Sequence, residues 1–345
     1  MSIDSRIGLL LVNLGSPEAP TPEALRPYLK EFLMDPDVID IPRLLRWGLV
    51  NLLIVPRRAP ASAELYQKIW TGEGSPLLVH SRAFADALVH ELETEDDLRI
   101  ALGMRYGKPG IGDAIDQLPL EDLDRLIVFP LYPQYAQSST LTVQKKVEAE
   151  LKSRGLASPV PEWIQPFYGD PRYIQAVADV SSASLTEFGP DFSLFSFHGL
   201  PERHLKRLHS TCLAASDCCD RITEANRNCY RAQSIATARS VAGALGIPRE
   251  KYAVSFQSRL GRTPWIRPFT DHVVEELPSK GVRRLAVFCP SFVADCLETL
   301  DEIENRERDR FLKAGGEELR LIPSLNASEA WVKAAANIVR DAIGV

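Results

Sequence analysis

The sequence lacks any apolar run long enough to cross a membrane. Its longest mainly apolar segments are Ile7–Leu14 and Leu49–Val55, whereas a membrane-spanning helix needs about 20 apolar residues. The N-terminal segment carries an arginine and an aspartate and has no small-residue cleavage site, which is not typical of a signal peptide. We therefore predict a cytoplasmic protein.

Basic residues are not in excess either. Lysine and arginine number 40 and aspartate and glutamate 46, so the net charge is −6, with a pI near 5.7. This balance disfavours a general nucleic-acid binder, which needs a basic face. The 6 cysteines are few for 345 residues, and in the cytoplasm they are expected to be ligands or free thiols rather than disulfides.

Nucleotide-binding glycine motifs are also missing. Gly72-Glu73-Gly74 lacks the third glycine of the dinucleotide fingerprint, and the segment from Gly103 to Lys108 is too short for a P-loop. No nucleotide cofactor is therefore predicted.

The sequence does contain short apolar runs that alternate with longer amphipathic stretches. The runs, which predict strands, are Ile7–Leu14, Arg99–Met104, Arg125–Leu131, Phe192–His198, Tyr252–Gln257, Arg284–Cys289 and Leu319–Pro323. The stretches, which predict helices, include Val79–Glu93, Thr140–Arg154, Ser234–Leu245, Asp295–Ala314 and Ser328–Ile343. Such alternation is typical of βαβ units with parallel sheets buried on both faces.

We therefore predict an α/β fold of two Rossmann-like, doubly wound domains with parallel sheets. The length agrees with two domains of about 150 residues each. Two prolines interrupt the pattern near Ser158–Trp163, so the domains are expected at 1–158 and 159–345. The second domain would carry a cysteine loop at 210–230 and the terminal helix, which could pack on either domain.

In doubly wound folds, ligands bind beyond the carboxyl ends of the strands. His198 ends one predicted strand, where a neutral imidazole can bind a metal or accept a proton; taken alone, such a histidine more often caps a turn. Asp295, Glu298 and Glu302 share one predicted helix face. These carboxylates could pass protons or a divalent cation, although a solvated acidic face is the simpler interpretation of the row alone.

Aromatic and cationic residues near other strand ends suit a large, flat, anionic ligand. Trp265 lies in a loop with glycine and proline, where it could form a flat wall. The guanidinium groups of arginines could form bidentate hydrogen bonds with ligand carboxylates. The further candidates are Tyr106, Tyr132, Tyr135, Arg105 and Arg259.

Together these segments closely resemble the ferrochelatases, the lyases that insert Fe²⁺ into a porphyrin at the last step of haem synthesis. The resemblance covers nearly the whole chain, in the family's order. The matching segments are LLVNLGSP at 10–17, KIWTGEGSPL at 68–77, GMRYGKP at 103–109, FPLYPQYAQSST at 129–140, FSFHGLPERH at 195–204, SFQSRLGRTPWIRPFT at 255–270 and PSFVADCLETLDEI at 290–303.

The resemblance implies a chelatase-like fold with a porphyrin cleft between the two domains, and protoporphyrin IX and Fe²⁺ as substrates. It implies that His198 and Glu298 are catalytic. The metal-binding set would be His198, Glu298, Glu302 and Asp295. The porphyrin-binding set would be Leu14, Arg105, Tyr106, Tyr132 and Trp265.

Several other functions stay open at this point. The substrate could be coproporphyrin, or a different ring with cobalt. The scaffold could also serve a non-catalytic porphyrin or haem carrier, an iron–sulfur sensor, or a periplasmic-type binding protein. A proton acceptor paired with carboxylates, as in His198 and Glu298, favours an enzyme over a carrier.

Four cysteines cluster within one short segment with the spacing C-x₅-C-C-x₉-C. They are Cys212, Cys218, Cys219 and Cys229. Four thiolates can hold a [2Fe–2S] cluster or a zinc ion, and the resemblance favours the cluster, with zinc and no metal as alternatives. Cys289 and Cys296 are predicted to be buried thiols, with Cys296 facing away from Glu298.

The segment Pro42–Val55 predicts a short helix that Pro56 ends. It is rich in leucine and flanked by arginines. A buried helix is one interpretation. An apolar lip that touches the membrane peripherally is the other, and the family resemblance favours it.

Overall fold

The computed structural model describes residues 6–93, 97–208, 212, 217–259, 261 and 263–345. The chain divides into two compact units. The first contains the described residues up to Tyr132, together with Gln137–Gln165 and Ala335–Val345, and the second contains Pro133–Ala136 and Pro166–Ala334. Relative to the expected domains 1–158 and 159–345, the segments 159–165 and 335–345 therefore group with the first unit.

The first unit is built on a parallel four-stranded sheet in the order β2-β1-β3-β4. Its strands are β1 (Ile7–Asn13), β2 (Leu98–Met104), β3 (Arg125–Pro130) and β4 (Pro161–Trp163). Every residue of β1 is buried, as expected for a central strand that is covered on both faces. The sequence did not predict β4, which begins with a proline at the sheet edge, where the missing N–H is tolerated.

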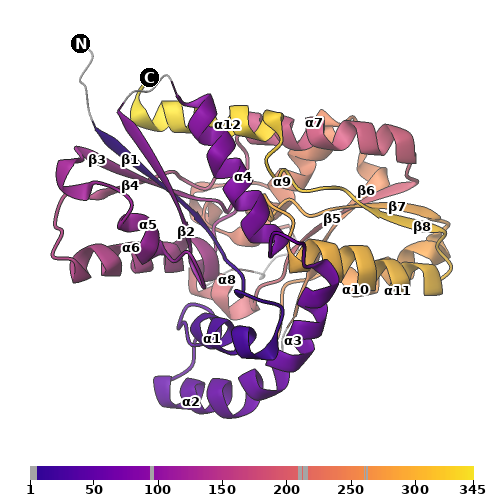
Figure 1. The fold of residues 1–345 in the computed structure, drawn as a ribbon. Coiled ribbons are helices and arrows are strands. Elements are labelled where there is room, and N and C mark those ends of the chain that lie inside the picture. The colour runs from indigo at the N-terminus through magenta and orange to yellow at the C-terminus, as the bar shows by residue number, and fades with distance from the viewer. Residues whose placement is uncertain (1–5, 94–96, 209–211, 213–216, 260, 262) are drawn as a thin grey trace. The chain divides into compact units, whose positions relative to one another are not determined.

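Helices cover both faces of this sheet (Figure 1). The α5 (Ile111–Ile115) and α6 (Thr142–Ser153) helices lie on one face, where Leu10 and Val12 of β1 join their buried cluster. The α4 helix (Pro76–Glu91) and the end of α12 (Glu329–Ile343) lie on the other.

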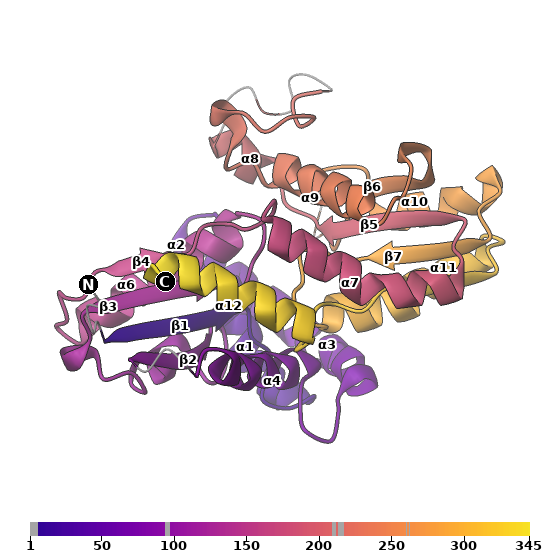
Figure 2. The same ribbon diagram turned by 90° about the horizontal axis from the view of Figure 1, so that it is seen from above.

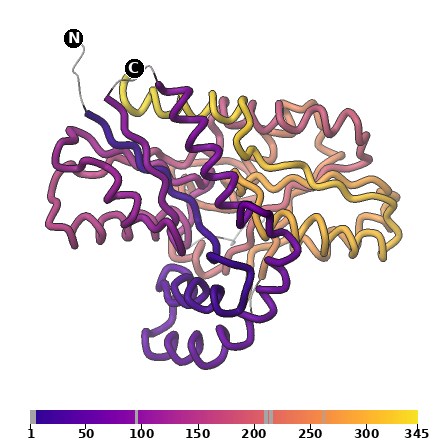
Figure 3. The backbone as a smooth tube through the Cα atoms, viewed as in Figure 1, coloured from indigo at the N-terminus to yellow at the C-terminus, as the bar shows by residue number. Residues whose placement is uncertain are grey.

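Between β1 and β2 the chain leaves the sheet and forms a helical excursion, drawn in indigo and violet in Figure 3. It contains α1 (Pro22–Leu33), α2 (Arg43–Gly48), a π-helix at Leu49–Ile54 and α3 (Val55–Ile69). The prediction that Pro56 ends the helix is wrong. Pro56 lies in the first turn of α3, and the helical backbone continues through it from α2 and the π-helix: the N–H of Val55, just before it, donates to the Val50 carbonyl.

The second unit repeats the plan with a parallel four-stranded sheet in the order β6-β5-β7-β8. Its strands are β5 (Phe192–His198), β6 (Tyr252–Gln257), β7 (Arg284–Phe288) and β8 (Glu318–Leu321). The α7 (Pro171–Phe188) and α9 (Tyr230–Ala244) helices cover one face, and α10 (Thr270–Glu276) and α11 (Arg308–Lys313) cover the other (Figure 2). The α8 helix (Glu202–Leu208) follows β5.

The helix expected over Asp295–Ala314 has an unexpected geometry. Its first part, Glu298–Glu307, is a π-helix, and only the part after it is the α-helix α11. Such π-segments are frequent at functional sites. The remaining short elements are a π-turn at Gln137–Leu141 and 3₁₀ turns at Leu120–Asp122, Glu224–Asn226, Arg249–Lys251 and Leu277–Lys280. In the described part of the chain, no helix is both long and apolar enough to span a membrane.

Candidate active site

His198 lies at the carboxyl end of β5, in the central part of the second sheet. The nearest acceptor to its Nδ1 atom is the Gly199 carbonyl oxygen, at 2.7 Å. Since a carbonyl can only accept, Nδ1 carries a proton, and the basic nitrogen of the corresponding neutral tautomer is Nε2. The His198 backbone N–H donates to the Ser291 hydroxyl at 3.2 Å. The half-buried imidazole is thus fixed in a tautomer that can accept a proton.

Gly199 brings His198 and Trp265 close to the end of the neighbouring strand. The Gly199 N–H donates to the Gln257 carbonyl at 2.6 Å. A Cβ atom on Gly199 would lie 2.6 Å from that carbonyl oxygen and 3.4 Å from Cε3 of Trp265. Trp265 is held in place by an antiparallel bridge to Pro201. Glycine is therefore needed for this close approach.

Asp295, one of the predicted metal ligands, is held by several hydrogen bonds. Its side chain is buried, and both carboxylate oxygens already accept hydrogen bonds. Oδ1 accepts from the Thr299 hydroxyl at 3.0 Å and from the Ser324 N–H at 3.3 Å, and Oδ2 accepts from the Asn326 amide at 2.8 Å. In this structure Asp295 anchors the beginning of the π-helix.

Glu298 and Glu302 lie on the π-helix and are half-buried. The Glu298 backbone carbonyl accepts a 2.8 Å hydrogen bond from Nε2 of Gln257, the residue that pairs with His198 in the sheet. The Glu302 carboxylate accepts from both the N–H and the hydroxyl of Ser258. Ser258 has a φ of 61°, and such strain in a non-glycine residue persists where the surroundings hold it.

The two cysteines near this row are both buried, as predicted. The prediction that Cys296 faces away from Glu298 is wrong, because its thiol hydrogen-bonds to the Glu298 side chain. Burial first, and then the negative charge of Glu298, raises the pKa of Cys296 well above the usual value of a thiol. The Cys289 thiol lies 3.8 Å from Oε1 of Gln257.

In the first unit, the loop after β2 is joined to the loop after β1. The backbone N–H groups of Arg105 and Tyr106 donate to the carbonyls of Asn13 (2.8 Å) and Leu14 (2.9 Å). Gly15 makes this possible: its φ is +99°, and a Cβ atom there would lie 1.8 Å from the Tyr106 carbonyl oxygen. Leu14 is half-buried beside this junction.

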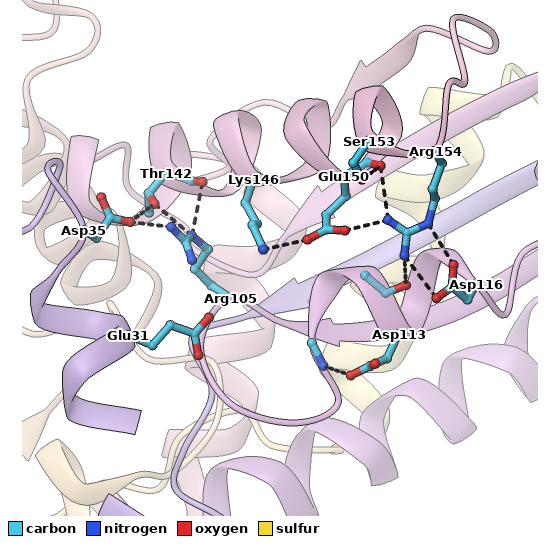
Figure 4. Close-up of polar contacts among 12 residues, drawn as sticks. Glu31, Asp35, Arg105, Asp113, Asp116, Thr142, Lys146, Glu150, Ser153 and Arg154 are labelled. Atoms are coloured by element: carbon cyan, nitrogen blue, oxygen red, sulfur yellow. Dashed lines mark hydrogen bonds and ion pairs between the residues drawn. The ribbon is translucent and has the colours of Figure 1, made fainter. Parts of the chain in front are cut away.

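The two arginines expected to meet ligand carboxylates are already paired inside the protein. The Arg105 guanidinium contacts Asp35 through Nη2, and its Nε donates to the Thr142 hydroxyl at 2.8 Å (Figure 4). The Arg105 side chain is only 11% exposed. Arg259 forms a bidentate pair with Asp271 at 2.7 and 2.8 Å. Both guanidinium groups thus already have a carboxylate partner inside the protein.

The two tyrosines of the expected porphyrin wall are buried to different degrees. Tyr106 is fully buried, its hydroxyl donates to Asp35 at 2.9 Å, and burial raises its pKa well above the usual value. Tyr132 is half-buried and packs against the first core, while its hydroxyl is buried and has no hydrogen-bond partner among the described residues. Burial also raises the pKa of Tyr132.

Among the predicted cysteine ligands, several sulfur atoms come together. The Sγ atoms of Cys218 and Cys219 lie 3.5 Å apart, and the Cys229 thiol hydrogen-bonds to those of Cys212 and Cys219. The hydrogen bond from Cys219 lowers the pKa of Cys229. Within the described residues, no group of three or more histidine, cysteine or acidic side chains has the geometry to hold a metal ion.

Two of the predicted segments lie partly outside the described residues. Of the cysteine loop 210–230, residues 210, 211 and 213–216 lie outside the described residues, as do 260 and 262 of the segment 255–270.

Sequence reasoning missed three residues that hydrogen-bond to predicted site residues within their own unit. Ser258 directly follows a predicted strand, so its position at a strand end was a usable signal. Asp35 and Thr142 follow a helix and a π-turn, and no local pattern distinguishes them from ordinary surface residues.

Comparisons with known proteins agree with this arrangement. The ferrochelatase family profile matches residues 6–343. The ferrochelatase of Coxiella burnetii (strain Dugway 5J108-111) is 46% identical over 344 residues, which cover 99% of this chain and 95% of the relative. The ferrochelatase of Legionella pneumophila (strain Paris) is 43% identical, with 98% and 100% covered.

Solved structures show the same fold at low identity. The chain superposes on SirB from Bacillus subtilis with Fe³⁺ at a TM-score of 0.54 and 14% identity, covering 97% of this chain and 95% of SirB. A SirB sirohydrochlorin chelatase in complex with cobalt gives a TM-score of 0.53 at 11% identity, with 97% and 94% covered. The predicted α/β chelatase-like fold is confirmed. On its sequence, its motifs and its fold, the chain belongs to the ferrochelatase family.

Proposed function

We propose that this protein inserts Fe²⁺ into protoporphyrin IX to form protohaem, the last step of haem synthesis. Family membership over nearly the whole chain supports this activity. The observation that carries it is the position of His198 and Glu298 at one end of the second sheet. Gln257 links them, because it pairs with His198 in the sheet and donates to the Glu298 carbonyl.

The reaction requires groups that remove protons and hold a cation. Two pyrrole N–H bonds break, the ring nitrogens bind the iron, and two protons leave, with no net electron transfer. His198 accepts the pyrrole protons at Nε2. Glu298 and Glu302 supply hard oxygen atoms for Fe²⁺ as it enters and carry protons away.

The porphyrin must bend before the metal can enter. Leu14 and Trp265 supply firm apolar and aromatic surfaces that favour the bent ring, with the strain drawn from binding energy elsewhere on the macrocycle. Tyr132 adds ring surface beside the first core. Arg105 and Tyr106 fix the position of Leu14, because both are largely buried and their backbone N–H groups donate to the carbonyls of Asn13 and Leu14.

The test is an anaerobic assay with protoporphyrin IX and Fe²⁺ that follows the loss of porphyrin fluorescence. Glu298→Gln and His198→Ala should abolish turnover while porphyrin still binds. Glu304→Gln is the matched control, because Glu304 is an exposed acid on the same π-helix. Full activity in Glu298→Gln would refute its role. Tight porphyrin binding by wild type without insertion would instead indicate a carrier, and faster turnover of coproporphyrin would reassign the substrate.

We also propose that this cytoplasmic enzyme touches the membrane through an apolar lip, residues 42–55. Its exposed side chains include Leu44 (86% exposed), Leu52 (70%) and Trp47 (51%). Exposed Arg57 and Arg58 follow directly. Exposed apolar side chains beside cations suit peripheral binding to anionic lipid, from which an apolar porphyrin could be taken up.

Co-sedimentation with phosphatidylglycerol vesicles tests the lip. The double variant Leu44→Glu/Leu52→Glu should lose vesicle binding, whereas Leu312→Glu, a partly exposed site on α11, should not. Equal binding by both variants would exclude the lip as the contact surface.

A [2Fe–2S] cluster is our proposal for Cys212, Cys218, Cys219 and Cys229. Four thiolates are the usual ligands of such a cluster, and the Sγ atoms of Cys218 and Cys219 lie 3.5 Å apart. When bound, the cluster would crosslink the loop. Anaerobic reconstitution should give about two irons and two sulfides per chain with the visible absorption of such a cluster. Cys219→Ser should lose both, and Cys289→Ser should keep them; zinc alone in the purified protein would refute the cluster.

A further inference from the structure

Asp35 is a buried carboxylate that the chemistry above does not use. It follows α1 and is 6% exposed. One of its oxygens, Oδ2, accepts hydrogen bonds from Arg105, from the Tyr106 hydroxyl at 2.9 Å and from the Thr142 hydroxyl. Figure 4 shows Asp35, Arg105 and Thr142 converging from three separate segments of the first unit.

Asp35 is itself held rigidly. Its second oxygen, Oδ1, accepts from the Asp37 N–H at 2.7 Å. Its backbone carbonyl accepts from the N–H groups of Val38 (3.2 Å) and Ile39 (3.0 Å). The carboxylate therefore has little freedom to turn, and it fixes the groups that bind it.

The pair of Asp35 and Arg105 is shielded from water. Their side chains are 3% and 11% exposed. Removing one charge of a buried pair leaves the other uncompensated, which is strongly unfavourable. The guanidinium carbon of Arg105 also lies 4.3 Å from the centre of the Tyr106 ring, so Asp35, Arg105 and Tyr106 form one packed group.

The packed group of Asp35, Arg105 and Tyr106 is linked by hydrogen bonds to the segment that contains the half-buried Leu14. The backbone N–H groups of Arg105 and Tyr106 donate to the Asn13 and Leu14 carbonyls. A movement of Arg105 or Tyr106 would therefore move Leu14, the half-buried residue at this junction.

We infer that Asp35 is a positioning residue for metal insertion, acting through Arg105 and Tyr106 on the surface that Leu14 offers to the macrocycle. Asp35 also balances the charge of Arg105 within the first unit. The inference rests on the proposed function.

The first test is Asp35→Asn, which keeps the side-chain shape and removes the charge. We expect KM for porphyrin to rise and kcat/KM to fall by on the order of 10- to 100-fold, as for other small displacements of groups that contact a substrate. KM for Fe²⁺ should stay unchanged. Asp37→Asn is the matched control. Asp37 pairs at 2.7 and 2.8 Å with Lys145, which lies on α6, the helix that also carries Thr142. The Asp37→Asn variant should stay within about twofold of wild type.

A second pair of variants decides the question if Asp35→Asn does not fold. Thr142→Val removes the hydroxyl that bonds to both Asp35 and Arg105, and Thr142→Ser retains it. Only Thr142→Val should weaken porphyrin binding and reduce the out-of-plane distortion of bound porphyrin, seen by resonance Raman spectroscopy.

Wild-type binding and distortion in Thr142→Val, or equal losses in Asp35→Asn and Asp37→Asn, would overturn the inference. Failure of the wild-type enzyme to insert iron would overturn the proposed function instead. The porphyrin-binding measurements would still test Asp35 in that case.

Discussion

Replacing Gly199 with alanine should damage catalysis much more than stability. The added Cβ atom would lie 2.6 Å from the Gln257 carbonyl oxygen, whereas ordinary contact begins at 3.4 Å. The loop must therefore shift by about 0.8 Å. Displacements of this size beside a reacting group lower turnover by on the order of 10- to 100-fold. Overpacking of this kind destabilises a fold by about 1–3 kcal/mol.

The shift reaches two proposed active-site groups directly. His198 precedes Gly199, and the Trp265 ring would lie 3.4 Å from the new methyl group. We expect kcat for iron insertion to fall in the anaerobic fluorescence assay while the melting temperature drops by about 2–4 °C per kcal/mol lost. Gly243→Ala is the control, because nothing lies within 4 Å of a Cβ atom there, and alanine favours the helix. Wild-type kcat in Gly199→Ala would refute this reasoning.

Two further predictions concern stability. Burial raises the pKa of Glu307 from 4.5 to about 7, and Arg310 opposes that rise. The folded state thus holds the proton more tightly than the unfolded chain, and stability falls as pH rises from about 4.5 to 7. The free energy of unfolding of Glu307→Gln should therefore exceed that of wild type by up to about 3 kcal/mol near pH 8 and by little near pH 4.5. A difference in melting temperature between variant and wild type that stays constant across this pH range would contradict the prediction. Arg154 joins Asp116, Glu150 and the Gly112 carbonyl in one network (Figure 4). Arg154→Met should cost about 1–2 kcal/mol in denaturant unfolding with unchanged turnover, and a loss of turnover in the folded variant would show that this network reaches the site.

The strands of both sheets were largely predictable because of their burial. Strands covered on both faces are continuous apolar runs, as in β1, and such runs stand out in a sequence. The edge strand β4 was missed because it has only 3 residues and no buried run. The π-helix at Glu298–Glu307 was expected to be an α-helix, because a pattern of apolar and acidic residues does not separate the two geometries.

The sequence by itself determined the fold class, the family and the placement of His198 at the end of a strand. These depend on local periodicity and on motifs that are continuous in the chain. Only the tertiary structure decided that Asp35 binds Arg105, 70 positions away, and that Asp271 engages Arg259. It also turned Cys296 toward Glu298 and anchored Asp295 on Asn326. The physical reason is that a buried charge or hydrogen-bonding group takes whichever partner the packing brings within reach, and strand order and helix placement decide that partner.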